Sequence, residues 1–347
     1  MKSDKFEVQA PTRADLCGGT IDIWPLYTFF GPARTINTAL TLHTKAKFEI
    51  LPSVSFQLEV SNGAAKATID EDFLEEALPS VPHEVRFPTW VCGAFLRGKS
   101  LPEKIVRVSY SSEAPRQSGL GGSSVLAIAL IAGLRHLLGE ESEKGWQWRV
   151  LEQARDIEAA YLKTLTGLQD YLAPLFGGLR SYGFGLGDFS ETKYSDNVTE
   201  ELSERMLILF SGELHQSGLS NWEVIKGAVD KKREITDGFY RVKEIGEKVD
   251  ELLQARTRDW SEIGKSLSED WEIRRNLFKV ETKRLEEITD FLDKQPILGR
   301  KVCGAAAGGS FLVLADPEKR GAVIAACKKN GIQVLECTIE PEPVTIL

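Results

Sequence analysis

The chain has 347 residues, of which 42% are hydrophobic and 27% are charged. This balance is typical of a folded protein with one large or two medium domains, and it excludes disordered and fibrous classes. Lys and Arg number 43 against 51 Asp and Glu, which gives a net charge of -8. Such an acidic balance argues against nucleic acid as a partner, because binding to a phosphate backbone requires a basic surface.

The N-terminal segment and the cysteines indicate the compartment. The first residues are polar and lack the apolar core of a secretion signal. No apolar run reaches the roughly 20 residues that cross a bilayer, so no membrane partner is expected. The five cysteines are well separated and have no CxxC spacing, which favours reduced thiols over disulfides or a zinc site. We therefore expect a soluble, cytoplasmic protein.

Strands and helices are predicted in blocks in the first half of the chain. Four short β-like runs come first, and they lie at 6–10, 45–50, 56–60 and 105–110. Two helices follow, one over 123–138 that starts at a serine and stops at Gly139, and one over about 148–164. The stretch 183–196 is rich in Gly and Asp, and its composition predicts a linker at a domain boundary.

The second half of the chain has a different order of elements. A buried strand is predicted at 206–211, and three charged amphipathic helices are predicted between 221 and 295. A βαβ-like passage follows, and its strand, helix and strand lie at 311–315, 317–330 and 332–340. This order predicts an α+β fold rather than an alternating Rossmann sheet, with domains at 1–190 and 200–347.

The stretch SGLGGSS at 118–124 places three glycines and three hydroxyls before the first predicted helix. A helix N-terminus carries unpaired N–H groups and a partial positive charge, so a glycine loop that leads into one can bind an anion. Ser123 and Ser124 can donate to phosphate oxygens or bind a hard metal ion. The stretch lacks the lysine of a P-loop and the last glycine of a dinucleotide fingerprint. Taken alone, it is equally typical of a plain turn and helix cap.

Two carboxylates and a second small-residue loop are further candidates. Glu158 lies on the second helix and Asp170 follows twelve residues later, so the two can converge on one cleft. One carboxylate can orient or accept the proton of a hydroxyl substrate, and the other can hold the magnesium that accompanies ATP. Either acid alone is more often an exposed helix residue. The loop GAAAGGS at 304–310 permits close approach of a ligand, and equally a tight hairpin.

Taken in order, these stretches resemble the GHMP kinase family, which includes galactokinase, homoserine kinase, mevalonate kinase and phosphomevalonate kinase. APTRADLCGGTIDI resembles the family's first motif, PRQSGLGGSS its nucleotide motif and CGAAAGGSFLVL its C-terminal glycine motif. GGTIDIWPLY, the extra glycine of GLGGSS and GLQDYLAPLFGG are most similar to the kinases of D-glycero-D-manno-heptose 7-phosphate, and next to fucokinase-like members. The resemblance implies an N-terminal ribosomal-protein-S5-like domain, a C-terminal ferredoxin-like domain and an active site between them.

The resemblance also implies residue roles and two cofactors, ATP and Mg²⁺. Asp170 matches the catalytic base, and Arg13 matches the basic residue that lowers the pKa of the acceptor hydroxyl or stabilises transferred charge. The magnesium ligands are expected to be Glu158 and Ser123, with Ser124 as the alternative to Ser123. The expected ATP-binding residues are Gly119, Leu120, Gly121, Gly122, Ser123 and Ser124. The expected substrate-binding residues are Gly19, Thr20, Asp22, Gln169 and Gly308.

The implied reaction is transfer of the ATP γ-phosphoryl group to a hydroxyl of a sugar or sugar phosphate, with a heptose 7-phosphate as the best guess. Two alternatives stay open: a mevalonate or homoserine kinase, and a regulator that binds ATP and sugar without catalysis. A sugar is expected to meet polar groups among His215, Ser217, Ser220 and Asn221. A phosphate on the acceptor needs a cation, and the candidates are Arg116, Arg180 and Lys193. The sequence leaves open whether the protein is a monomer or a homodimer.

Overall fold

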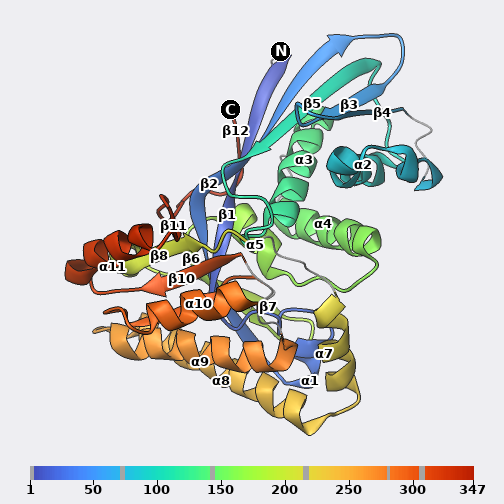
Figure 1. Cartoon of the computed structure of the whole chain (residues 1–347). Coiled ribbons are helices and arrows are strands. Elements are labelled where there is room, and N and C mark those ends of the chain that lie inside the picture. Colours follow the sequence, from blue (N-terminus) through green and yellow to red (C-terminus); the bar gives the residue numbers. More distant parts are fainter. Residues whose placement is uncertain (1–3, 71–74, 141–144, 214–218, 280–281, 305–308) are drawn as a thin grey trace.

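A computed structural model describes residues 4–347 except 71–74, 141–144, 214–218, 280–281 and 305–308 (Figure 1). The described strands form two sheets, of eight and four strands. In these ranges, no helix combines the length and the apolar character needed to cross a membrane. The cysteines are all free.

The larger sheet is built around two long antiparallel strands, β1 and β2. Its order is β12-β1-β2-β5-β3-β4, and the hairpin of β6 and β7 is attached to β2. The strands are β1 (Lys5–Cys17), β2 (Ala33–Pro52), β3 (Gln57–Ser61), β4 (Lys66–Ile69), β5 (Lys104–Ser112), β6 (Leu179–Phe184), β7 (Phe189–Lys193) and β12 (Thr345–Ile346).

Strand β1 changes character along its length. Burial alternates up to Gln9, as in a sheet with one face toward solvent, and every residue from Ala10 to Cys17 is buried. The second half is covered from both sides because Leu16 belongs to the same apolar cluster as Leu267 and Leu312, which come from the C-terminal half of the chain. The residues of this buried half are therefore placed where the two halves of the molecule meet.

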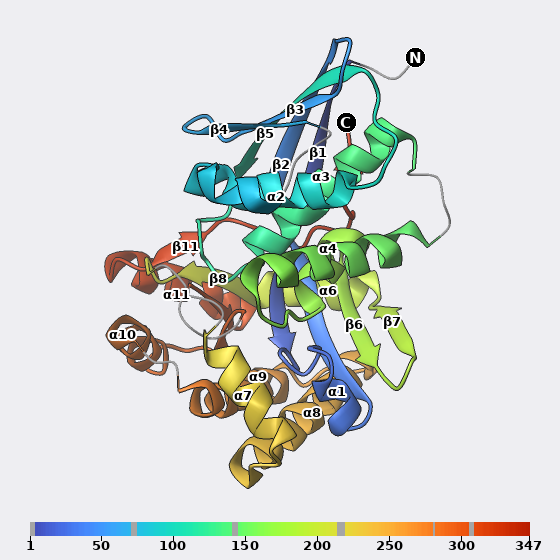
Figure 2. The same ribbon diagram turned by 90° about the vertical axis from the view of Figure 1, so that its right-hand side faces the viewer.

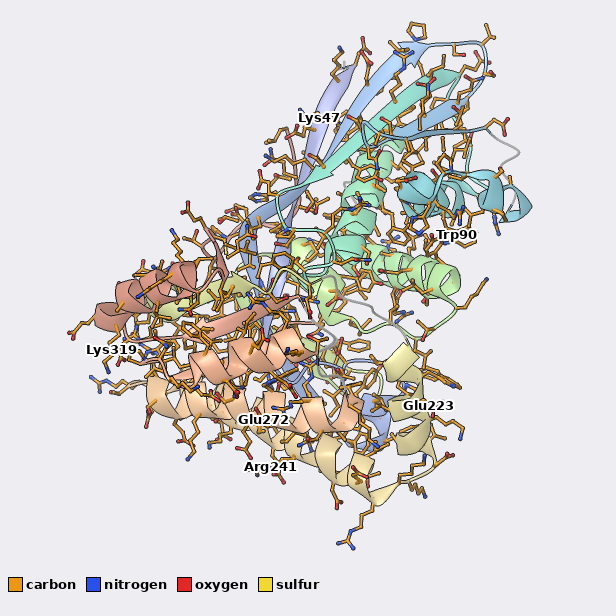
Figure 3. All side chains as sticks on the ribbon, viewed as in Figure 1. Lys47, Trp90, Glu223, Arg241, Glu272 and Lys319 are labelled. Carbon is orange, nitrogen blue, oxygen red and sulfur yellow. The ribbon has the colours of Figure 1, made fainter. Side chains whose placement is uncertain are left out.

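Helices cover one face of the larger sheet (Figures 1 and 2). The first-half helices are α1 (Leu26–Phe29), η1 (Glu75–Ser80), α2 (His83–Leu96), α3 (Gly122–Leu138), α4 (Trp146–Leu162) and α5 (Gln169–Phe176). Helix α3 is buried along most of its length and lies directly on β2, because a Cβ at Gly133 would come within 2.2 Å of the Phe48 ring. Trp90 of α2 donates to the Ile157 carbonyl of α4 at 2.8 Å and joins these two helices (Figure 3).

The smaller sheet is antiparallel, with strand order β11-β8-β10-β9. Its strands are β8 (Met206–Phe210), β9 (Gly299–Val302), β10 (Ser310–Leu314) and β11 (Gln333–Leu335). The helices of this half are α6 (Asp196–Arg205), α7 (Leu219–Val229), α8 (Arg233–Gln254), α9 (Trp260–Phe278), α10 (Lys283–Leu292) and α11 (Pro317–Lys329). From β8 to β11 the chain follows the β-α-β-β-α-β pattern of ferredoxin-like folds, with extra helices after the first strand. The predicted α+β class is confirmed.

Several sequence predictions were wrong in detail. The stretch 183–196 is no linker: Phe184 pairs with Phe189 in the β6–β7 hairpin, and the Gly and Asp residues mark its turn. The aromatic rings of Tyr27, Phe184 and Phe189 pack together, which stabilises a segment whose composition indicates a loop. The region 221–295 is covered by four helices, α7 to α10, rather than three.

The predicted strand 332–340 ends at Leu335 because the chain then crosses to the larger sheet. Ile339 forms a bridge with Leu40, and the Gly178 N–H donates to the Glu340 carbonyl at 2.7 Å. Strand β12 then pairs with β1, Thr345 opposite Gln9. The last residues therefore belong to the larger sheet, and the domain bounds at 190 and 200 stay a prediction.

Candidate active site

The glycine loop at 118–124 leads into α3 as predicted. Gly119 and Gly121 have φ of +75° and +77°, a conformation that side-chain-bearing residues rarely adopt. Leu120, between them, is fully buried, and its carbonyl accepts a hydrogen bond from the Arg13 N–H at 3.2 Å. The loop is thereby fixed to β1 while the first turn of α3 keeps N–H groups available for an anion.

The serines of the loop bind a carboxylate instead of capping the helix. The residue before α3 is Gly121, which has no side chain, so the predicted serine start was wrong. Ser123 donates to one oxygen of Glu158 at 2.6 Å, and Ser124 donates to the other at 2.7 Å. Ser123 is exposed, and Ser124 is buried.

Glu158 on α4 is a buried carboxylate surrounded by hydroxyls. It is 3% exposed and accepts a third hydrogen bond, from the Tyr171 hydroxyl at 2.6 Å. Burial raises its pKa, and the three hydroxyls offset part of that rise. No Lys, Arg or His in the described part of the chain forms an ion pair with Glu158. A buried carboxylate with hydroxyl neighbours and no cation is the type of group that a hard metal ion binds.

Arg13 on β1 contacts both Asp170 and the glycine loop. Its Nε and Nη2 lie 2.8 and 2.6 Å from the same Asp170 oxygen, and Nη1 donates to the Gly119 carbonyl at 2.5 Å. Burial disfavours the charge of Arg13, but Asp170 and then Asp15 outweigh it and raise the pKa of the guanidinium. The Asp170 side chain keeps 33% of its surface exposed and that of Arg13 only 2%. Asp170 is thus accessible from solvent while Arg13 stands behind it.

Asp22 holds the start of α5, which carries Asp170 as its second residue. One Asp22 oxygen accepts hydrogen bonds from the N–H groups of Leu168 at 2.6 Å and Gln169 at 2.8 Å. A Cβ at Gly167 would lie 2.4 Å from that oxygen, so the contact requires glycine. Burial raises the pKa of Asp22 to about 6. Sequence reasoning assigned Asp22 to the substrate, and the structure also gives it this positioning contact.

Three buried oxygens next to α5 have no hydrogen-bond partner among the described residues. They belong to the side chains of Asp22, Asn37 and Gln169. The Asn37 amide donates to the Gln169 carbonyl at 3.0 Å. A Cβ at Gly19 would lie 3.1 Å from the Gln169 amide, which places Gly19 beside the same group. Sequence reasoning missed Asn37, because an asparagine inside a long strand carries no motif signal.

A network of buried charges lies behind these residues, and sequence reasoning missed it as well. Lys301 on β9 contacts Asp15 at 2.6 Å and Asp270 at 3.2 Å. Arg274 on α9 contacts Asp15 at 3.2 Å and donates to the Thr20 hydroxyl at 3.2 Å. Burial opposes ionisation of Asp15, but Lys301, Arg274 and Arg13 outweigh it and lower its pKa. The signal in the sequence was a lysine inside the buried four-residue strand GRKV and an Asp–Arg pair four residues apart on α9.

Gly304 and Gly309 of the C-terminal glycine motif, the third motif of the family resemblance, pack directly on the glycine loop at 118–124. The Gly304 N–H donates to Asp15 at 2.9 Å, and a Cβ at Gly304 would lie 2.9 Å from the Gly119 carbonyl oxygen. A Cβ at Gly309 would come within 2.3 Å of the Ser118 carbonyl oxygen. Both glycines have positive φ, +73° and +103°. The two loops therefore lie backbone against backbone, and glycine is required where they touch.

Several other residues were expected at the site from the sequence. Gly308 and Ala305–Ala307 lie outside the described residues, as do His215 and Ser217, while Ser220 and Asn221 lie in the first turn of α7. Arg180 is not available for a phosphate: its Nε and Nη2 donate to the carbonyls of Gly177 at 2.7 Å and Phe176 at 2.8 Å, and Nη1 pairs with Glu191. Its role in the structure is to hold the turn between α5 and β6.

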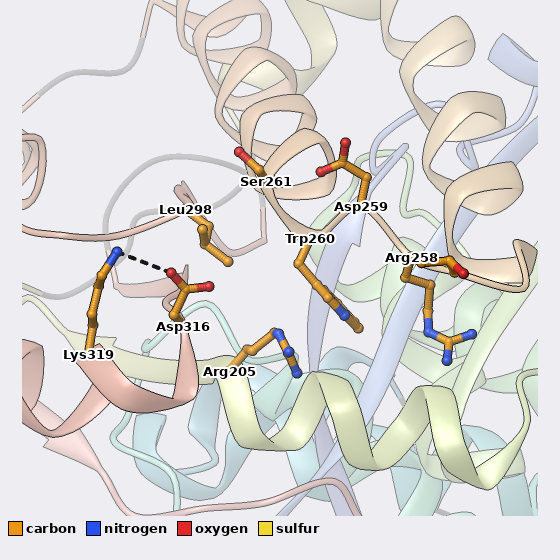
Figure 4. Close-up of a pocket in the computed structure, with 9 residues that line it drawn as sticks. Arg205, Arg258, Asp259, Trp260, Ser261, Leu298, Asp316 and Lys319 are labelled. Atoms are coloured by element: carbon orange, nitrogen blue, oxygen red, sulfur yellow. Dashed lines mark hydrogen bonds and ion pairs between the residues drawn. The ribbon is translucent and has the colours of Figure 1, made fainter.

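Two cavities differ in their relation to these residues. One of about 310 Å³ adjoins the segment before α5, and is lined by Trp24, Arg155, Asp156, Ala159, Leu165 and Thr166. The other, of about 700 Å³, contains none of the candidate site residues (Figure 4). In it, the Arg205 guanidinium stacks on Trp260 at 4.9 Å, and Lys319 pairs with Asp316 at 3.2 Å.

Two protein-family models match the chain, one in each half. The GHMP kinases N terminal domain matches residues 88–178, and the GHMP kinases C terminal domain matches residues 249–333. Together they span about half of the chain. The first match includes Glu158, Asp170 and the glycine loop, and the second includes Lys301 and the third glycine motif.

Relatives and solved structures agree with these matches. The bifunctional fucokinase/GDP-fucose pyrophosphorylase of Arabidopsis thaliana is 25% identical over 91% of this chain, which spans only 30% of that relative's length. The D-glycero-alpha-D-manno-heptose 7-phosphate kinase of Campylobacter jejuni is 24% identical over 67% of this chain and 68% of its own. The crystal structure of a D-glycero-D-manno-heptose 1-phosphate kinase from Bacteroides thetaiotaomicron has a TM-score of 0.75 at 19% identity, covering 99% of this chain and 98% of that one. At this identity the structure shows the fold alone.

Proposed function

Because this chain belongs to the GHMP kinase family, we propose that it transfers the γ-phosphoryl group of ATP to a hydroxyl of a sugar or sugar phosphate, with a heptose phosphate as the best candidate. The observation that carries the proposal is the Arg13 guanidinium, which contacts Asp170 and the Gly119 carbonyl at once. One group thereby links the residue that would receive the acceptor's proton to the loop that would hold the donor's phosphates. Phosphoryl transfer depends on such positioning and charge stabilisation.

Different residues would bind the phosphoryl donor and the acceptor. The N–H groups at the start of α3, with the left-handed Gly119 and Gly121, would bind the ATP phosphates. Asp170, accessible and held by Arg13, would orient the acceptor hydroxyl and take its proton. Arg13 would also stabilise the charge that moves between the two substrates. This geometry also argues against the regulator alternative, since a protein that only binds ATP has no need of an accessible carboxylate on a buried arginine.

The oxygen atoms of Glu158 and of Ser123, at the start of α3, fit a magnesium ion. Glu158 is a buried carboxylate without a cation among its described neighbours, and Ser123 presents an exposed hydroxyl beside it. Mg²⁺ prefers oxygen ligands and is commonly held by one or two carboxylates together with substrate phosphates. Bound there with ATP, the ion would neutralise charge on the phosphate oxygens. Ser123 is the better ligand of the two serines, because Ser124 is buried.

The acceptor side is rich in hydrogen-bond acceptors, which favours a polyhydroxyl substrate. The unpartnered oxygens of Asp22, Asn37 and Gln169 would accept hydrogen bonds that sugar hydroxyls donate. Mevalonate offers only two hydroxyls and would leave at least one of these three oxygens unpaired. The 310 Å³ cavity has space for the distal end of the acceptor. Arg155 in its lining pairs with Asp156 at 2.8 Å, and it would have to exchange that carboxylate for an acceptor phosphate.

We also propose that the protein works in the cytoplasm. The free cysteines of the described chain fit a reducing environment, and we place the reaction in the cytoplasm.

The deciding experiment is an ADP-release screen of the purified protein with ATP and Mg²⁺. The acceptors would be heptose 7-phosphates, heptose 1-phosphates, free hexoses, fucose, mevalonate and homoserine. Turnover with a sugar or sugar phosphate is expected. Turnover with mevalonate or homoserine alone would overturn the sugar assignment, and silence across the panel together with measurable ATP binding would favour the regulator.

A further inference from the structure

Six ionisable side chains form one connected group where β1, α5, α9 and β9 meet. Three are cations and three are anions, and they are Arg13, Arg274, Lys301, Asp15, Asp170 and Asp270. All except Asp170 are at most 2% exposed. The charges balance, so removal of any buried member leaves an uncompensated charge in a medium that solvates it poorly.

The distances show which cation pairs with which carboxylate. Asp15 contacts Lys301 at 2.6 Å and Arg274 at 3.2 Å, whereas Arg13 is 3.9 Å away from it. Arg13 instead contacts Asp170 at 2.8 and 2.6 Å. Arg13 thus lies between two carboxylates, and it pairs with Asp170 while other cations satisfy Asp15.

We propose that Lys301 and Arg274 are positioning residues for phosphoryl transfer, which keep Arg13 on Asp170 by neutralising Asp15. The inference rests on the proposed roles of Arg13 and Asp170. Both positioning residues belong to the C-terminal half, whereas the residues they orient belong to the N-terminal half. The C-terminal half would therefore contribute to turnover through charge, in addition to its contact with the glycine loop.

The variant that tests this is Lys301→Met, which removes the charge and keeps a long apolar side chain. Asp15 would then attract Arg13, and a shift of about 1 Å in a catalytic group can cost about 10²-fold in rate. We expect kcat to fall about 10- to 100-fold while the KM for ATP changes little. The double variant Asp15→Asn/Lys301→Met removes the attraction, and should recover most of the lost kcat. A merely structural role would instead lower the melting temperature of the single variant and leave the kcat of the folded protein unchanged.

Arg300→Met is the matched control. Arg300 precedes Lys301 on β9, is 6% exposed, and contacts Asp293 at 2.8 Å and Glu272 at 3.2 Å. Glu272 lies on α9, along the lower part of the molecule (Figure 3). The control also loses a largely buried cation with two acidic partners, so a lower melting temperature is expected with an unchanged kcat. Should Lys301→Met fail to fold, Arg274→Gln makes the same test from α9.

A readout without turnover separates this inference from the proposed function. In protein labelled with ¹⁵N-arginine, the buried Nε–H of Arg13 reports its bond to Asp170, and Arg13→Lys assigns the signal. The signal should move in Lys301→Met and return in the double variant. An unmoved signal, or an unchanged kcat in folded Lys301→Met, overturns the inference. Absence of turnover in the wild type would contradict the proposed function, and the Arg13 signal would still decide this question.

Discussion

The Tyr171 hydroxyl donates to the Glu158 carboxylate at 2.6 Å, and this bond joins α5 to α4. Because Tyr171 directly follows Asp170, the same short helix carries the proposed base and a ligand-orienting group for the proposed metal site. A movement of α5 would therefore disturb both ends of the phosphoryl transfer.

Tyr171→Phe should weaken magnesium binding without abolishing turnover. Glu158 would keep the two serine donors and lose one hydrogen bond, and contacts that orient a metal ligand typically contribute about 10-fold in metal affinity. The Mg²⁺ concentration for half-maximal ADP release should rise about 10-fold. Tyr161→Phe is the control, because Tyr161 lies on the same helix as Glu158 and packs on Phe87. An identical Mg²⁺ dependence in both variants would contradict the assignment of Glu158.

Asp170→Asn should lower kcat by roughly 10²–10⁴-fold and leave ATP affinity nearly intact. The amide keeps the size of the side chain but accepts no proton from the acceptor. ATP affinity measured by calorimetry separates binding from chemistry. Asp290→Asn, an exposed carboxylate on α10, should behave as the wild type. Turnover at the wild-type rate in Asp170→Asn would remove this residue from the mechanism.

Asp22 should make stability depend on pH in a defined window. Burial raises its pKa from the ordinary 3.8 to about 6, so the folded protein holds this proton more tightly than the unfolded chain does. The free energy of unfolding therefore falls as the pH rises from about 4 to about 6, and the loss is complete above the folded pKa.

Asp22→Asn has no titrating proton at this position, so its free energy of unfolding does not fall over this pH range for that reason. Its free energy of unfolding minus that of the wild type should rise by about 2 kcal/mol between pH 4 and pH 7. Urea unfolding of both proteins at four pH values measures this difference. A constant difference would mean that Asp22 titrates at its ordinary pKa in the folded protein.

Gly309→Ala should damage ATP binding through the backbone of the glycine loop. The new Cβ would lie 2.3 Å from the Ser118 carbonyl oxygen, so one of the two loops must move. We expect the KM for ATP to rise at least about 10-fold. Gly331→Ala shares the positive φ but has no atom within 4 Å of the added Cβ. It should lose stability without a change in the KM for ATP, and equal KM values in the two variants would exclude the steric explanation.

Local patterns predicted the glycine loop and helix α3 well, because glycines, serines and an apolar run act within a few residues of one another. The boundaries of α3 agree with the prediction to one residue at the N-terminus, and Gly139 ends it as expected. Arg13 and Asp170, 157 residues apart, were assigned to one active site by motif resemblance rather than by periodicity, and their contact comes from the structure.

The buried charge network was not predictable in the same way. Asp270 and Arg274 lie on an amphipathic helix, where charges usually face solvent, and their burial follows only from the contact of α9 with β1 and β9. The linker prediction at 183–196 failed for a related reason. Backbone pairing of β6 with β7 and the contacts of Phe184 and Phe189 outweigh a loop-like composition.

The return of the C-terminal tail to β1 has a consequence for synthesis. Strand β12 pairs with β1 at one edge of the larger sheet, and all other strands of that sheet are synthesised before residue 194. The N–H of Gly178, two residues after α5, donates to the carbonyl of Glu340, which is synthesised much later. While the ribosome adds the intervening residues, β1 has no partner on that side in the nascent larger sheet. The larger sheet therefore becomes complete only after the C-terminal half has been translated.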